Sequence, residues 1–206
     1  MLIRCIAAFY YFCSDSVVGM PSRRDTLLDA AIGVVARAGA KGLTHRAVDA
    51  SAAAPQGSTS NHFRTRAALV SAIAQRLEER DAALWTDPPG TLEELLDRLT
   101  AFAAALCADA DATLARLALA QELPDHLAGG HQRLLAALRE ALVTCGVADA
   151  DARAPLVAAF LDGLVQHTLT VRRGTPFDED ACRLGLSLLC AAAPDRPCLA
   201  SHSDIC

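Results

Sequence analysis

Apolar residues recur along the chain at the three-to-four-residue spacing of amphipathic α-helices. The first stripe lies within residues 22–38 and consists of Leu27, Leu28, Ala31, Val34, Val35 and Ala38. This spacing puts the side chains on one face of a helix. Ser22, with Asp25 three residues later, predicts a capped helix start, and Gly39 predicts its end. We therefore expect a helix over residues 22–38.

Two short helical segments follow, separated by small residues and a proline. The first is expected from the capping residue Thr44 to about Ala52, with Ala47, Val48 and Ser51 facing inward. It ends before Pro55, because a residue that precedes proline is disfavoured in the α region. The second segment, residues 57–63, is crowded with Ser, Thr, Asn and His. The pair predicts a helix-turn-helix, whose second helix enters the DNA major groove.

The rest of the chain predicts one helix after another. Further helices are expected over residues 66–84, 91–108, 109 or 111 to 123, about 131–145 after a break at Gly129 and Gly130, 149–173 and 177–193. Residues 87–90, Asp-Pro-Pro-Gly, form the clearest break. Ala and Leu dominate and β-branched runs are scarce, which favours an all-α fold of about nine helices.

These patterns divide the chain into four parts. Residues 21–66 are expected to form a helix-turn-helix domain and residues 67–193 a helical body. Residues 1–20 are expected to be a disordered extension, or not to be translated, since Met20-Pro21-Ser22 resembles a natural start. The tail, residues 194–206, contains prolines and serines and is expected to be disordered.

Charge is distributed unevenly between these parts. The chain carries a net charge of −5, but residues 21–66 hold seven basic and three acidic residues, a net +4. Residues 67–206 hold 11 Arg and 20 acidic residues, a net −9. A basic head on an acidic body is expected when only the head meets DNA phosphates.

Residues at the starts of the two short helices are expected to contact DNA. Thr44 lies at a helix N-terminus, where backbone N–H groups and the helix dipole favour a phosphate. Arg46 can reach a phosphate or a guanine edge. Gly57 lacks a side chain, which lets the backbone approach DNA closely.

Base reading is expected from exposed positions early in the second helix, namely Gln56, Ser58, Thr59 and Asn61. His62 and Arg66 are expected to hold the phosphate backbone. Phe63 is expected to pack in the core instead. The alternative is that the Ser, Thr and Asn side chains only cap a surface turn.

This part of the chain resembles the DNA-binding domain of the TetR family of bacterial transcription regulators. The resemblance rests on residues 43–69, LTHRAVDASAAAPQGSTSNHFRTRAAL, which follow a first helix. The family opens its recognition helix with Gly, here Gly57, and carries a basic residue three beyond a Phe, here Arg66. Ser60 stands where the family usually has a phosphate-contacting Tyr. The resemblance therefore implies that His62, Arg64 and Arg66 carry more of the phosphate contact.

The body is expected to bind a small molecule and to form a homodimer. Polar residues within apolar helices, with nearby aromatic residues, suggest a ligand pocket made of Trp85, Phe102, Gln121, Glu122, Phe160, Gln166 and His167. For each of these residues taken alone, an ordinary core or hinge role is favoured over a ligand contact. The last two helices are apolar on several faces, which predicts a four-helix bundle with a second copy. A monomer with a larger shared core is the alternative.

Several other functions find no support in the sequence. The eight cysteines form no CxxC pair and have no zinc-finger spacing to histidine, so neither a metal nor a cofactor is expected. Cysteines in apolar helices act as small hydrophobic residues, which suggests a reducing cytoplasm, with redox sensing as the minor alternative. No apolar run reaches the roughly 20 residues that span a bilayer. The sequence contains no motif of a catalytic nucleophile, a phosphate-binding loop or a catalytic zinc site, so an enzyme is not predicted.

The sequence thus predicts a regulator that binds a palindromic operator as a twofold dimer. Its two recognition helices would lie about one DNA turn apart, on the order of 34 Å. A repressor released by a small-molecule ligand is the preferred interpretation. The alternative is a constitutive or architectural DNA binder without a ligand.

Overall fold

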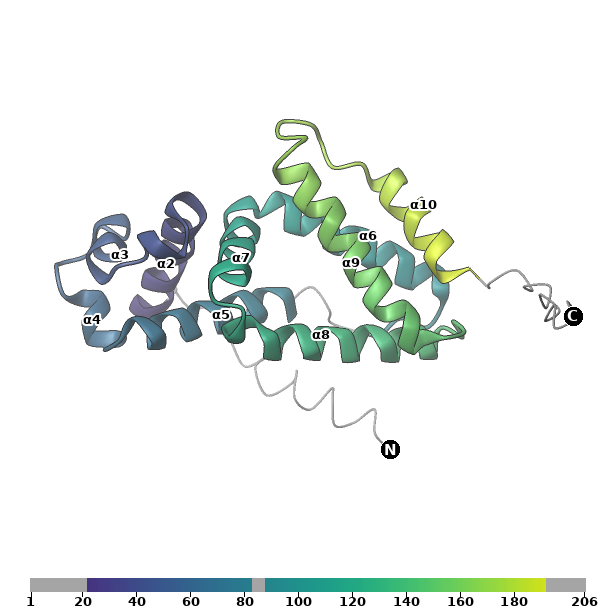
Figure 1. The fold of residues 1–206 in the computed structure, drawn as a ribbon, viewed down its shortest axis with the longest axis horizontal. Helices are drawn as coiled ribbons and strands as arrows, with labels where there is room; N and C mark the ends of the chain where they lie inside the picture. The colour runs from purple at the N-terminus through teal and green to yellow at the C-terminus, as the bar shows by residue number, and fades with distance from the viewer. Residues whose placement is uncertain (1–21, 83–87, 192–206) are drawn as a thin grey trace, which may run out of the picture.

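The computed structural model describes residues 22–82 and 88–191, and all regular secondary structure in this part of the chain is helical (Figure 1). It contains α2 (Arg23–Ala38), η1 (Ala40–Gly42), α3 (His45–Ser51), α4 (Ser58–His62), α5 (Arg66–Ala82), α6 (Leu92–Ala108), α7 (Ala110–Glu122), α8 (Asp125–Thr144), α9 (Ala150–Leu169) and α10 (Glu179–Cys190). The predicted all-α fold is confirmed. The expectations for residues 1–20, for Trp85 and for residues 194–206 lie outside the described residues.

Helix starts follow the capping signals of the sequence. At α2 the Ser22 hydroxyl accepts a hydrogen bond from the Asp25 N–H at 3.1 Å, and the Asp25 carboxylate accepts one from the Ser22 N–H at 3.3 Å. The predicted capping box is therefore confirmed. At α6, Thr91 caps the Glu94 N–H at 3.2 Å, but the Glu94 carboxylate accepts from the Gly90 N–H at 2.7 Å instead of from Thr91. Only half of a capping box therefore forms at the start of α6.

The predicted break at Gly129 and Gly130 is wrong, because α8 begins at Asp125 and runs through both glycines. Each glycine costs a helix about 1 kcal/mol relative to alanine. Contacts with neighbouring helices offset this cost, since α8 packs against both α5 and α9. Arg133, one turn later, donates two hydrogen bonds to the Glu78 carboxylate of α5, at 2.5 and 2.7 Å. Tertiary packing thus overrides a local helix-breaking signal.

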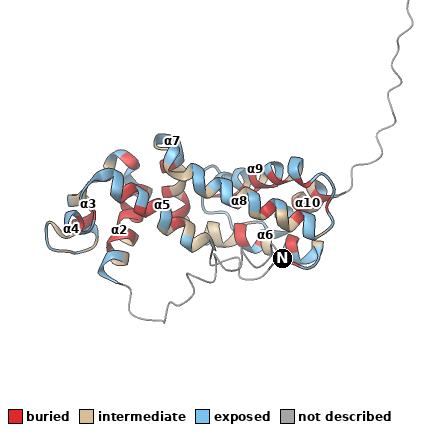
Figure 2. Ribbon diagram, turned by 90° about the horizontal axis from the view of Figure 1, so that it is seen from below, coloured by how far each residue is buried: buried red, intermediate tan, exposed pale blue. Residues whose placement is uncertain are grey.

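Buried side chains form two clusters at opposite ends of the molecule (Figure 2). The first joins α2, α3 and α5 and takes in Ala112, Ala115 and Leu119 of α7. The second is built from α6, α8, α9 and α10. The first cluster therefore extends past residue 66 into α5 and α7. The division of the chain at residue 66 stays a prediction.

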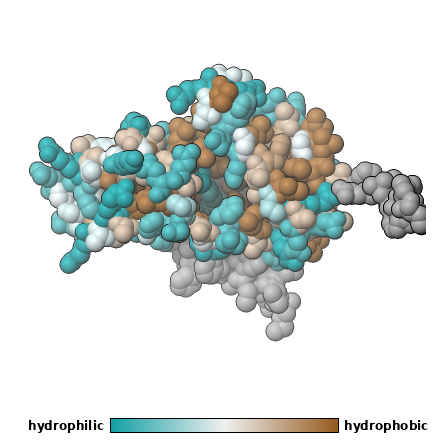
Figure 3. Space-filling model, in the orientation of Figure 1, coloured by the Kyte–Doolittle hydropathy of each residue, from teal (hydrophilic) through white to brown (hydrophobic). Residues whose placement is uncertain are grey.

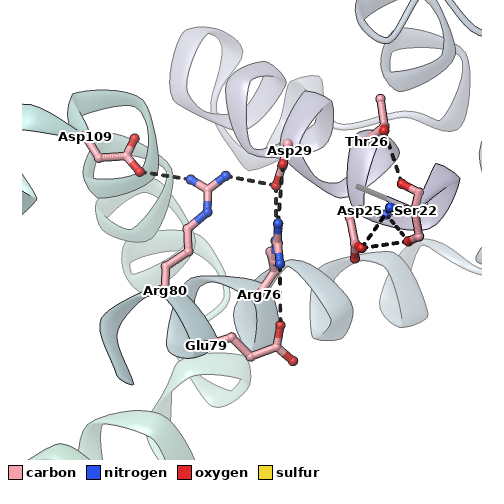
Figure 4. A network of polar contacts seen from close by, with 8 residues as sticks. All are labelled: Ser22, Asp25, Thr26, Asp29, Arg76, Glu79, Arg80 and Asp109. Atoms are coloured by element: carbon pink, nitrogen blue, oxygen red, sulfur yellow. Dashed lines mark hydrogen bonds and ion pairs between the residues drawn. The ribbon is translucent and has the colours of Figure 1, made fainter. Parts of the chain in front are cut away.

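A network of ion pairs joins the first cluster to the corner between α6 and α7 (Figure 4). Asp29 of α2 accepts hydrogen bonds from Arg76 at 3.2 Å and from Arg80 at 2.9 Å, both on α5. Arg80 also donates to Asp109 at 2.9 Å. Asp109 caps α7 by accepting from the Ala112 N–H at 3.3 Å. One guanidinium, that of Arg80, therefore connects α2 with the start of α7.

Large apolar side chains reach the surface on the last two helices. Leu156 of α9 is 56% exposed, and Leu184 and Leu188 of α10 are 61% and 69% exposed. Hydrophobic surface gathers over this end of the molecule, away from α3 and α4 (Figures 1 and 3). Among the described helices, none is both long and apolar enough to cross a membrane.

Candidate nucleic-acid interface

Helices α3 and α4 lie together at one end of the molecule, far from α10 (Figure 1). Thr44 starts α3 by accepting a hydrogen bond from the Ala47 N–H at 3.1 Å. The turn between the helices contains two residues in the left-handed region, Ala53 with φ 47° and Gly57 with φ 92°. Glycine adopts this conformation without strain, which explains Gly57 at the start of α4.

Asp49 is a site residue that the sequence interpretation missed. It lies on α3, is only 4% exposed, and accepts three hydrogen bonds from the start of α4. The donors are the Gly57 N–H at 2.7 Å, the Thr59 N–H at 2.8 Å and the Thr59 hydroxyl at 2.5 Å. Desolvation acts to raise the pKa of Asp49, but the hydrogen bonds from Thr59 and Gly57 prevail and hold it below its usual value.

Two expectations about these helices are wrong. Thr59 was expected to be an exposed base-reading residue, but its side chain is fully buried against Asp49. Ser51 was expected to face inward, but it is exposed and accepts a hydrogen bond from Arg37 at 3.3 Å. The inward positions of α3 are those of Val48 and Asp49. The buried Asp49 carboxylate and Thr59 hydroxyl hydrogen-bond each other, which allows both polar residues to occupy core positions.

The other predicted base-reading residues are accessible. Gln56 and Asn61 are exposed, and within the described part of the chain neither side chain makes a hydrogen bond. Ser58 is half-buried and donates to the Pro55 carbonyl at 2.7 Å, and exposed Ser60 donates to the Gly57 carbonyl at 2.9 Å. Gln56 and Asn61 therefore offer both amide donors and acceptors to a partner, whereas the two serines offer acceptor oxygens.

The predicted cationic contacts fall into two groups. Arg46 and Arg64 are exposed, and within residues 22–82 and 88–191 neither forms an ion pair. Arg66 is also exposed, but it donates to the Ala40 carbonyl at 2.6 Å and so ties α5 to η1. His62 is exposed beside Phe63. Arg46 and Arg64 are thus the arginines best placed to meet phosphates.

Phe63 is buried, at 4% exposure, as the sequence predicted. It belongs to the first cluster, and the Arg24 guanidinium lies over its ring at 5.3 Å. The His45 imidazole Nε2 lies 2.7 Å from the Phe63 carbonyl oxygen, which joins α3 to the end of α4. The recognition helix is therefore held at both ends, by Asp49 at its start and by Phe63 at its end.

The expectation that a polar set is embedded in the body is wrong. Exposed side chains are found at Gln121, Glu122, Gln166 and His167. The apolar residues of α9 face α6, α8 and α10, which turns Gln166 and His167 towards solvent. Phe102 is buried, and Phe160 packs on α10 so closely that a Cβ at Gly185 would lie 2.2 Å from its ring. These four side chains are therefore not embedded within the single chain, and the ligand pocket itself stays a prediction.

A different charged group lies among the helices of the body. Arg116 of α7 donates to both carboxylate oxygens of Asp81 on α5, at 2.7 and 2.9 Å. Desolvation raises the pKa of Asp81, although Arg116 opposes the shift. Desolvation also raises the pKa of Asp162 on α9, against His131 of α8 and Arg116. Arg116 therefore joins α7 to α5, whereas Asp162 and His131 are exposed and affect each other only through their charges.

Comparisons with known proteins identify relatives among solved structures. A member of the TetR family from Streptomyces coelicolor A3 is 26% identical and covers 84% of this chain and 100% of its own, with a TM-score of 0.67. The multidrug binding protein EbrR complexed with imidazole is 30% identical over 86% of this chain and 100% of its own, with a TM-score of 0.60. EbrR structures complexed with malachite green, ethidium and proflavin also match.

A TetR-like transcriptional regulator from Rhodococcus sp. RHA1 shares the fold at 18% identity, over 84% of this chain and 96% of its own, with a TM-score of 0.68. No protein-family model matches the chain, and neither does any curated protein.

Proposed function

Because the chain belongs to the TetR family of transcriptional regulators, we propose that it is a homodimeric repressor that a small molecule releases from a palindromic operator. The observation that carries this proposal is the exposed surface of α3 and α4. Gln56 and Asn61 offer amide groups there, and Arg46 and Arg64 offer positive charge that no carboxylate of the described residues pairs with. This surface belongs to the basic head, residues 21–66, with a net +4. Phosphate contacts position a protein on DNA, and base contacts specify the sequence.

A second copy of the chain is the expected partner of α9 and α10. Their exposed leucines, Leu156, Leu184 and Leu188, would be buried in a four-helix bundle about a twofold axis. Such a dimer presents two recognition helices to two half-sites. Ligand binding must then favour a spacing of the heads that no longer fits the operator.

Substitutions in α3 and α4 are expected to separate phosphate contact from base reading. Arg46→Ala should weaken binding to all duplexes and reduce the salt dependence by about one counterion, because it removes one phosphate contact. Asn61→Ala should lower operator affinity by about 1–3 kcal/mol with little change on unrelated DNA. Gel shifts over a range of salt, with the DNA upstream of the chain's own coding region, measure both effects.

Arg139→Ala provides a matched control for these variants, since it removes an exposed arginine from α8 in the acidic body. It should leave operator affinity unchanged. An equal loss in Arg139→Ala, or no loss in either head variant, would contradict the assignment of α3 and α4 as the DNA-contacting surface.

For the effector we propose an aromatic cation bound beside Asp162 of α9. EbrR is described in complexes with malachite green, ethidium and proflavin, which are aromatic cations. In this chain Arg116 already pairs with Asp81 through both carboxylate oxygens. Asp162 is exposed and makes no hydrogen bond or ion pair with the other described residues, and partial desolvation raises its pKa. An unpaired carboxylate of this kind gains from a positive charge that a ligand brings.

Malachite green is expected to raise the unfolding temperature and to release operator DNA. Ethidium and proflavin intercalate into duplex DNA, so they are used only in titrations without DNA. Asp162→Asn should weaken dye binding about tenfold, equivalent to about 1.4 kcal/mol. The matched control is Asp151→Asn, which alters an exposed carboxylate on the same helix, paired with Arg139. Fluorescence titration measures the affinities. Equal affinities in both variants would contradict the site, and operator binding unaffected by malachite green would favour a constitutive DNA binder.

A further inference from the structure

The recognition helix α4 has no side chain of its own to cap its start. It comprises only Ser58–His62, and the residue before it, Gly57, has no side chain. A helix of this length is unstable by itself, because nucleation fixes several residues for few hydrogen bonds. The first backbone N–H groups of a helix also need partners from outside it. The position of α4 therefore depends on groups supplied by other segments.

Asp49 supplies this cap from the neighbouring helix. Its carboxylate accepts from the backbone N–H of Gly57 at 2.7 Å and of Thr59 at 2.8 Å. A negative charge at a helix N-terminus is also favoured by the helix dipole. Since Asp49 is buried, water cannot easily replace either bond. The start of α4 is thus fixed relative to α3.

The Thr59 hydroxyl adds a contact that fixes rotation. It donates to the same carboxylate at 2.5 Å, so the backbone and the side chain of one residue are both held. With Thr59 fully buried, the neighbouring Ser60 and Asn61 are turned outward and exposed. Rotation of α4 would bring Thr59 to the surface and leave the Asp49 carboxylate buried with fewer donors. That state is disfavoured, because an unpaired buried charge is costly.

We propose that Asp49, with Thr59, is a positioning residue for DNA reading: it sets the rotation of α4 that presents Asn61 to the DNA bases. This inference rests on the proposed function. In this arrangement the backbone N–H groups of Gly57 and Thr59 bind Asp49 and are therefore not free to bind DNA phosphates. Phosphate contacts consequently fall to side chains, chiefly those of Arg46 and Arg64.

The test compares specific with non-specific DNA binding. A duplex that the wild-type chain enriches from a random pool serves as the operator, and a scrambled duplex of equal length as the non-specific probe. Asp49→Asn keeps the size of the side chain but places an NH₂ group where an acceptor is needed. We expect operator affinity to fall tenfold or more, with non-specific affinity at low salt unchanged within about twofold.

Variants of Thr59 and Asp25 separate positioning from general stability. Thr59→Val removes the hydroxyl and should lower the operator preference about threefold to tenfold, whereas Thr59→Ser keeps it and should match the wild type. Asp25→Asn removes the capping carboxylate of α2, another helix of the head, and should leave the preference unchanged. If the Asp49→Asn chain does not fold, Thr59→Val carries the test. Hydrogen exchange should show the Gly57 and Thr59 amides losing protection in both Asp49→Asn and Thr59→Val.

Operator preference equal to that of the wild type in both Asp49→Asn and Thr59→Val would overturn the inference and leave the proposed function standing. A parallel loss of specific and non-specific binding in Thr59→Val would also overturn it, because this indicates a purely structural role. Failure of the wild-type chain to enrich any sequence would overturn the proposed function, and the inference with it.

Discussion

Glutamate at both Leu184 and Leu188 is expected to separate the dimer and to lower operator affinity at least about a hundredfold. These leucines are 61% and 69% exposed on α10, on the surface that we propose to be buried against a second copy. In a twofold interface each substitution occurs twice, so four carboxylates would enter an apolar contact. Burying unpaired charges is strongly unfavourable. A separated head then binds one half-site without the advantage of its linked partner.

Light scattering and gel shifts measure the two effects of this double variant. Val143→Glu provides the control, because Val143 is a comparably exposed apolar residue but lies on α8. It should leave both the mass and the operator affinity unchanged. A dimer that persists in the double variant would place the interface elsewhere on the chain. A monomeric wild-type chain would contradict the proposed dimer itself.

Helices and their starts were largely predictable because their signals are local. Ser22 with Asp25, Thr44 and Asp109 each mark a helix start within a few residues, and the structure uses all of them as caps. Gly129 and Gly130 illustrate the limit of local signals. Glycine lowers helix propensity whatever surrounds it, but the contacts of α8 with α5 and α9 depend on segments far away in the chain.

The candidate interface was predictable as a surface but not in its internal hydrogen bonds. Polarity alone groups Thr59 with Gln56 and Asn61, although Thr59 is buried. Its burial depends on Asp49, ten residues earlier, and no periodicity connects the two positions. Likewise, Gln166 and His167 lie in an apolar stretch, yet which face of α9 is covered depends on α6, α8 and α10. Contacts between residues far apart in the chain decide which of these side chains are buried, and such contacts cannot be recognised in a single sequence.

Phe63→Ala is expected to destabilise the DNA-binding end by about 3–5 kcal/mol, the usual effect of truncating a buried phenylalanine. The ring is 4% exposed within the first cluster and also lies under the Arg24 guanidinium. Its loss leaves a cavity at the end of the recognition helix. Operator binding should disappear, while α6, α8, α9 and α10 keep their own cluster and hence the dimer. Phe63→Leu, which retains most of the volume, should cost less than about 1.5 kcal/mol.

Thermal unfolding of Phe63→Ala should therefore proceed in two steps. Circular dichroism measures the loss of helix, and light scattering measures the loss of the dimer. Leu142→Ala provides the converse variant, since Leu142 is fully buried in the second cluster. It should lower stability by about 2–5 kcal/mol and weaken the dimer before the head unfolds. The ion pairs of Arg80 with Asp29 and Asp109 are partly solvent-accessible and so couple the two ends only weakly. A single transition in Phe63→Ala, with dimer and head lost together, would instead mean that α5 and α7 join both clusters into one cooperative unit.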